Sequence, residues 1–160
     1  MNVREALRIG IDIAEYCCMA YLEDLSDEDL MRRPAPGMNH INWQVGHLIA
    51  SEYQMIEQAR PGCSPPLPAG FAEKYSKETA AIDDPSSFHT KEELLAVYRK
   101  QREATLAALE SIPEEDFAQE TGIDYAPTVA ALFSMQGSHW MMHSGQWVVV
   151  RRQMGKPPLF

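Results

Sequence analysis

Apolar residues recur every three or four positions along most of this chain, a spacing typical of long helices. Near the N-terminus the stripe runs through Val3, Leu7, Ile11, Ala14, Cys18, Leu22 and Leu25. A period of 3.6 residues places these side chains on one face of a helix about six turns long. No segment shows the sustained alternation of a strand ladder. We therefore expect helices and no β-sheet.

The second long helix is expected over residues 40–59, with Asn39 as its N-cap and Pro61 beyond its end. Residues 61–88 then contain five prolines and two glycines without sustained periodicity. We interpret them as a surface crossover with one helical turn near residues 71–75. A loop of this length in a compact domain is often functional, so it is a candidate wall for a binding site.

Two further long helices are expected in the C-terminal half. Thr90 and Glu93 form a capping box at the start of the third helix. The fourth is expected to be capped by Thr128 and to run to Met154, just before a glycine and two prolines. The sequence therefore predicts an all-α fold. It is a single domain, residues 1–160, built as a four-helix bundle with a long crossover between helices two and three.

Composition excludes several classes of partner. The 160 residues carry 23 acidic against 14 basic side chains, a formal net charge of −9. This balance disfavours nucleic acid, because phosphate binding depends on Lys and Arg, and it disfavours a polybasic membrane surface. The three cysteines form no CxxC pair, and the N-terminus has no apolar signal-peptide region. We expect a cytoplasmic protein without disulfides.

The segment between Asp124 and Arg151 has no charged residue and is long enough to span a bilayer. Polar side chains interrupt it throughout, and these are unfavourable in hydrocarbon. They are Gln136, Ser138, His139, His143, Ser144 and Gln146. We therefore interpret this segment as a helix buried in a protein core, and we expect no membrane association.

Three histidines are candidate metal ligands. His139 and His143 are four residues apart on the fourth helix, so both imidazoles leave the same face one turn apart. Helical HxxxH pairs of this spacing bind divalent metals. His47 lies in the middle of the second helix. Unpaired imidazoles in a core are unfavourable, and one ion would satisfy all three while leaving a position open for water or substrate.

Each histidine also has a simpler interpretation. His47 can bond a backbone carbonyl, and His139 can bond Gln44 or Ser51. A zinc protease of the HExxH type is excluded, because position 140 is tryptophan. His40 lies about 10 Å along the helix axis from His47, so it belongs to the helix end or to the pocket rim. The candidate pocket residues on the two facing helices are His40, Trp43, Gln44, Ser51, Met135, Gln136 and Gln146.

The segments NHINWQVGHLIASE and GSHWMMHSGQWVVVRRQMGKPP resemble the two signature helices of the DinB-like (DinB/YfiT) superfamily. Those proteins are four-helix bundles with one metal-ligand histidine on the second helix and an HxxxH pair on the last. The resemblance implies that His47, His139 and His143 bind one Zn²⁺ or Ni²⁺ ion. Water or another exogenous ligand would complete the coordination.

The resemblance also implies what the metal does. Characterised relatives include thiol-dependent S-transferases and a mycothiol-dependent maleylpyruvate isomerase, in which the metal activates a low-molecular-weight thiol. We therefore expect a metal-dependent enzyme, a low-molecular-weight-thiol-dependent S-transferase acting on a small-molecule substrate. The alternatives are a non-catalytic metal-binding protein and a metal-dependent hydrolase of unknown substrate. Bundles of this family commonly pair, so we expect a homodimer.

Overall fold

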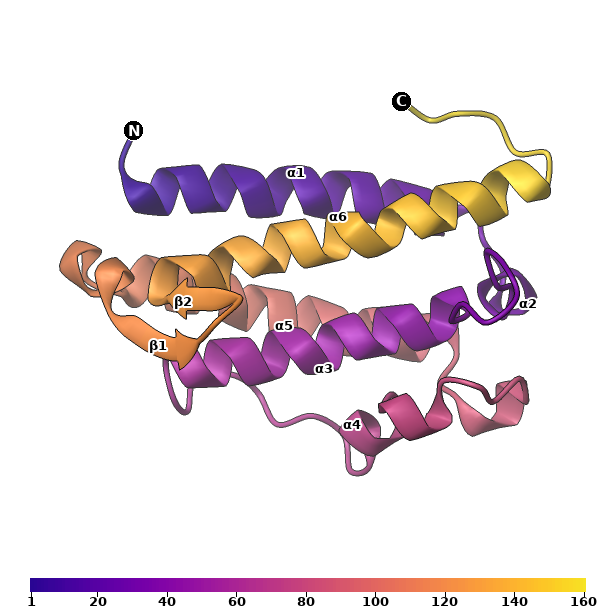
Figure 1. The fold of residues 1–160 in the computed structure, drawn as a ribbon, viewed down its shortest axis with the longest axis horizontal. Coiled ribbons are helices and arrows are strands. Elements are labelled where there is room, and N and C mark those ends of the chain that lie inside the picture. Colours follow the sequence, from indigo (N-terminus) through magenta and orange to yellow (C-terminus); the bar gives the residue numbers. More distant parts are fainter.

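Four long helices dominate the structure, a computed structural model that describes residues 1–160 (Figure 1). They are α1 (Val3–Glu23), α3 (Ile41–Ala59), α5 (Lys91–Ser111) and α6 (Val129–Gln153). The short elements are α2 (Asp27–Leu30), α4 (Phe71–Lys74), and the 3₁₀ turns η1 (Lys77–Thr79), η2 (Pro85–Ser87) and η3 (Glu114–Ala118). Helices account for 66% of the residues, so the predicted all-α bundle is confirmed.

The helices form two pairs of opposite direction. Helices α1 and α6 lie side by side and run the same way, whereas α3 and α5 run the other way (Figure 1). Because α3 and α5 are parallel to each other, the chain must travel back the length of a helix, about 30 Å, between them. Residues 60–90, with α4, η1 and η2, make this return along the outer side of α3. The predicted crossover and its helical turn near residues 71–75 are confirmed.

Most helix ends follow the capping signals in the sequence. Thr90 and Glu93 form the expected capping box on α5, and Thr128 accepts a hydrogen bond at the start of α6. The prediction for α3 was wrong, because His40 and not Asn39 is the N-cap. The Nδ1 atom of His40 accepts from the backbone N–H of Trp43 at 3.0 Å, in place of the more common Asn oxygen.

A small hairpin connects η3 to α6, and the expectation of no β-sheet was wrong at this point. Strand β1 (Glu120–Ile123) pairs antiparallel with β2 (Ala126–Thr128). Gly122 has a φ of 75°, and the register shifts between Glu120 and Ile123. Strands of four and three residues are too short to display alternation in the sequence, and this irregularity shortens the regular ladder further.

Helices α1 and α6 pack closely against each other. A Cβ at Gly137 would lie 2.8 Å from the carbonyl oxygen of Gly10, so glycine lets these two backbones approach. Trp140 and Trp147 are fully buried with their rings at 90° to each other, so both pack in the core. None of the helices has both the length and the apolar character that a membrane span requires.

Candidate metal centre

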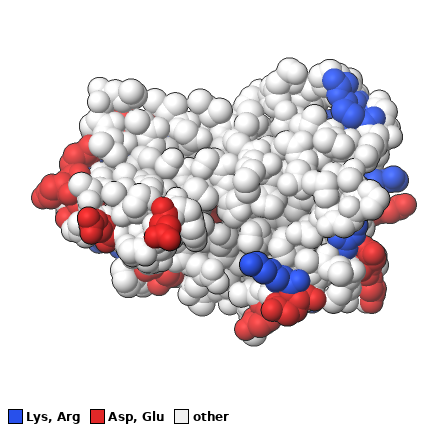
Figure 2. All heavy atoms as spheres, in the orientation of Figure 1, with Lys and Arg blue, Asp and Glu red and all other residues white.

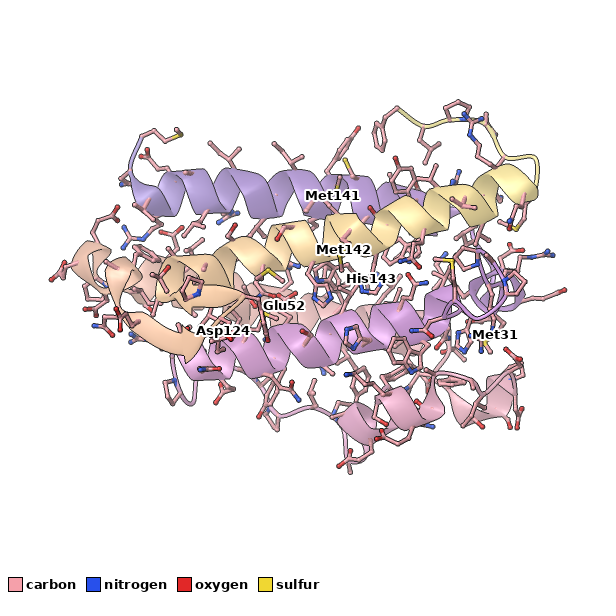
Figure 3. The ribbon with its side chains drawn as sticks, viewed as in Figure 1. Met31, Glu52, Asp124, Met141, Met142 and His143 are labelled. Carbon is pink, nitrogen blue, oxygen red and sulfur yellow. The ribbon has the colours of Figure 1, made fainter.

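The structure brings the three predicted histidines together between two helices. His47 comes from α3, while His139 and His143 come from successive turns of α6. Each offers a ring nitrogen, and these atoms lie within 4.8 Å of one another. The ring centroids are 5.0–5.6 Å apart. Figure 3 shows His143 extending from α6 into the space beside α3.

All three rings are neutral at pH 7 and therefore have a lone pair to offer. Burial, together with the neighbouring histidines of the group, lowers the pKa of His139 and of His143 to about 4. Burial also lowers the pKa of His47, and the charge of Lys77 adds to this effect. Neutral imidazole is the form that binds metal ions.

The spacing of the donors fits one ion. Imidazole nitrogens bind zinc at about 2.0–2.1 Å in a tetrahedral arrangement, which places two of them about 3.4 Å apart. The ring nitrogens of the three histidines lie at most 4.8 Å apart, and small side-chain rotations would bring them to this distance. The group contains no carboxylate and no thiol. The donor set is thus three imidazoles, with one tetrahedral position left for an exogenous ligand.

One side of His143 is held by a buried amide. The Nδ1 atom of His143 lies 3.1 Å from Oε1 of Gln44, which is fully buried on α3. The same Oε1 accepts from Nε1 of Trp147 at 2.9 Å. The Nε2 atom of Gln44 donates to the carbonyl of Asn39 at 2.6 Å and to Oε1 of Gln146 at 3.1 Å. Gln44 therefore contacts the histidine group, whereas Gln146 hydrogen-bonds to Gln44 and to none of the three histidines.

One face of His47 is covered by Trp43. The two rings stack at 5.0 Å with an angle of 7° between their planes. The indole N–H of Trp43 points outward and donates to the carbonyl of Ser76 and to Oγ1 of Thr79, both in the crossover. The crossover thus reaches the edge of the histidine group through Trp43. Contact between the crossover and the site was expected. Lys77 of the crossover, whose charge acts on His47, was not identified from the sequence.

Two of the predicted pocket residues are turned elsewhere. His40 bonds the backbone of Trp43 and the carbonyl of Ile82, so it serves the helix end. The side chain of Gln136 donates to the carbonyl of Leu132 and contacts Sδ of Met55 in the interior. Ser51 and Met135 are half-buried, and their role in a pocket stays a prediction.

A glutamate that the sequence analysis did not single out lies close by. Glu52 follows His47 by five residues but turns into the core, where it pairs with Arg102. It also accepts from Thr105 and from the indole N–H of Trp140. Figure 3 shows Glu52 nearer the hairpin end than His143. The sequence signal that could have revealed this pair is an acidic residue on the apolar face of one helix and a basic residue on the apolar face of another.

Comparison with known proteins agrees with this geometry. The sequence profile of the DinB superfamily matches residues 18–147, a range that contains all three histidines. No curated protein matches the chain significantly. The crystal structure of a conserved protein from Enterococcus faecalis is similar, with a TM-score of 0.70 and 20% sequence identity over 98% of this chain and 99% of that one. At this identity the likeness shows the fold alone.

Proposed function

Because the chain belongs to the DinB superfamily, we propose that it is a metal-dependent enzyme with one ion bound by His47, His139 and His143. The observation that carries the proposal is the convergence of three neutral imidazoles within 4.8 Å. Imidazole suits both Zn²⁺ and Ni²⁺, so we propose one of these two ions. Three protein ligands leave a position for a small molecule, as in catalytic rather than structural sites.

The reaction that we propose is the transfer of a low-molecular-weight thiol to a small electrophilic substrate. A bound divalent ion supplies Lewis-acid chemistry, which lowers the pKa of a thiol at the open position. Trp43 shields one face of His47, and Gln44 holds His143. Lys77 offers a positive charge at the rim, suited to an acidic thiol or substrate. No carboxylate belongs to the histidine group, so no side-chain base is assigned.

The test incubates metal-loaded protein with a panel of small thiols and the electrophile monochlorobimane. We expect conjugation that depends on the metal and is lost in His143→Ala. The matched control is Ser138→Ala, a small change at an exposed position of the same helix. Absence of turnover with every thiol, in protein shown to hold metal, would contradict the transferase.

Two alternatives use the same three histidines. A metal-dependent hydrolase would place water at the open position, and it would cleave ester or amide substrates without any added thiol. A non-catalytic metal-binding protein would turn over neither set of substrates. The thiol panel, run beside a panel of hydrolysable substrates, separates the three.

We also propose that two copies of the chain pair. Ile9, Ile13 and Tyr16 are exposed along one side of α1, and Met142 and Val149 are exposed on α6. The central part of the face in Figure 2 carries no Lys, Arg, Asp or Glu, and the charges gather toward its ends and lower edge. Light scattering is expected to give twice the chain mass of 18.0 kDa. The chain mass itself at micromolar concentration would contradict the dimer.

The proposed location is a reducing cytoplasm. Cys17, Cys18 and Cys63 are all free thiols in the structure, and free thiols persist where glutathione and thioredoxin keep cysteines reduced. Fractionation of the native cells with an antibody against the chain would test the location. Recovery in an oxidising compartment would contradict it.

A further inference from the structure

Two partners that do not belong to the metal centre fix the orientation of the Gln44 amide. The indole N–H of Trp147 can only donate, so the atom that faces it at 2.9 Å must be the amide oxygen. The backbone carbonyl of Asn39 can only accept, so the atom that faces it at 2.6 Å must be the amide nitrogen. Both ends of the Gln44 amide give the same orientation, and neither argument uses the histidines.

This orientation determines which nitrogen of His143 carries the proton. The Oε1 atom of Gln44 has no hydrogen to give, so Nδ1 of His143 must be the donor across their 3.1 Å contact. A neutral imidazole carries a single ring proton. With that proton on Nδ1, the other nitrogen, Nε2, keeps its lone pair free for a ligand bond.

We propose that Gln44 is a positioning residue of the metal centre, which holds His143 in the Nδ1–H tautomer and so presents its Nε2 to the ion. The inference rests on the proposed metal site. Of the three histidines in that site, His143 is the one with a ring hydrogen bond inside the protein. Without the acceptor, the ring would favour the Nε2–H tautomer that imidazole side chains prefer in water, which blocks the metal-binding nitrogen.

The size of the effect follows from comparable metal sites. Removing an outer partner of a ligand histidine typically weakens metal affinity about 10–100-fold, because the ring loses both its tautomer and its orientation. Gln44 also bonds Gln146 and Trp147 of α6, so a structural role must be separated from the positioning role. Gln146→Leu is the matched control, because it removes one bond of the same amide and leaves the bond to His143.

The experiment has two readouts. Long-range ¹H–¹⁵N NMR on the metal-free protein reads the tautomer of His143, and titration of Zn²⁺ against a chromogenic chelator reads the affinity. We expect the Nδ1–H tautomer in the native protein and in Gln146→Leu, and the Nε2–H tautomer in Gln44→Leu. Zinc affinity should fall about 10–100-fold in Gln44→Leu and stay unchanged in Gln146→Leu.

Failure of this inference and failure of the proposed function look different. An Nε2–H tautomer in the native protein overturns the inference, and this measurement needs no variant to fold. Unchanged tautomer and affinity in a folded Gln44→Leu also overturn it. Native protein that shows the Nδ1–H tautomer but binds no zinc contradicts the metal site, and the hydrogen-bond assignment stands.

Discussion

Glu52 on α3 and Arg102 on α5 form an ion pair inside the bundle, with 2.8 Å between Oε2 and Nη2. The side chains are 0% and 4% exposed. The indole N–H of Trp140 on α6 donates to the same glutamate oxygen at 3.0 Å. The pair therefore links three long helices close to the histidines of α3 and α6. It fixes how these helices face each other where the histidine group forms.

Replacement of Glu52 by leucine should destabilise the fold by about 3–5 kcal/mol, because it leaves the Arg102 guanidinium buried without its counter-ion. Urea unfolding of the native protein and of Glu52→Leu measures this. The double variant Glu52→Leu/Arg102→Met is the control, and it should recover most of the loss. Equal losses in the single and double variants would mean that packing, and not the buried charge, accounts for the effect.

Tyr75 of the crossover packs directly against Gly46 of α3. A Cβ at this position would overlap the ring of Tyr75, which is 2% exposed and bonded to Nδ1 of His89 at 2.9 Å. Gly46→Ala should therefore lower the free energy of unfolding by about 1–3 kcal/mol.

Gly145→Ala is the matched control, because a Cβ there meets nothing within 4 Å. Gly145 also lies inside a helix, where alanine is favoured over glycine by about 1 kcal/mol. The melting temperature should fall in Gly46→Ala and rise in Gly145→Ala, relative to the native protein. A Gly46→Ala variant as stable as the native protein would contradict the tight contact with Tyr75.

Stability at acid pH should depend on Asp24, at the end of α1. Hydrogen bonds from Arg151 and Lys156 lower the pKa of Asp24 to about 2. The unfolded value is about 3.9, so the carboxylate stabilises the fold above that pH and the contribution is lost as pH falls toward 2. Asp24 is 50% exposed, so solvent screening keeps the effect small.

We expect Asp24→Asn to be less stable than the native protein at neutral pH. The difference should be constant above about pH 5 and shrink to roughly half near pH 3. Urea unfolding of both proteins between pH 7 and pH 3 measures it. A difference that does not change with pH would show that the charge of Asp24 is not responsible.

In the proposed transferase, Lys77 should strengthen the binding of acidic thiols. Its side chain is exposed in η1, and its charge helps to lower the pKa of His47. Lys77→Met should weaken binding of the anionic thiol glutathione by about 0.2–1 kcal/mol, the usual size of an exposed charge interaction. Binding of the cationic thiol cysteamine should not weaken. The control is Lys100→Met, an exposed lysine on α5, and equal effects of both substitutions would contradict selection by Lys77.

The long helices were predictable because the signals that specify them lie within a few residues of each other along the chain. The apolar stripe of α1 and the capping box of Thr90 and Glu93 depend on neighbours three or four residues away. The start of α3 was misplaced by one residue, because a buried histidine took over the capping role usual for Asn. The hairpin before α6 was missed because its strands are too short to show a period.

The histidine group was predictable for a similar reason. The spacing of His139 and His143 fixes one face of α6, and His47 is the histidine at mid-height of the opposite helix. The pairing of Glu52 with Arg102 joins residues fifty positions apart, and no local pattern specifies it. The same holds for the approach of the crossover to Trp43, which depends on tertiary packing.

Metal content of the purified protein tests the central claim most directly. Untagged protein prepared without chelators and supplied with Zn²⁺ or Ni²⁺ should retain one ion per chain by plasma mass spectrometry. The His47→Ala variant, treated identically, should retain only trace metal, because two imidazoles of one helix hold an ion far more weakly than three. Native protein that retains no more metal than His47→Ala would contradict the account.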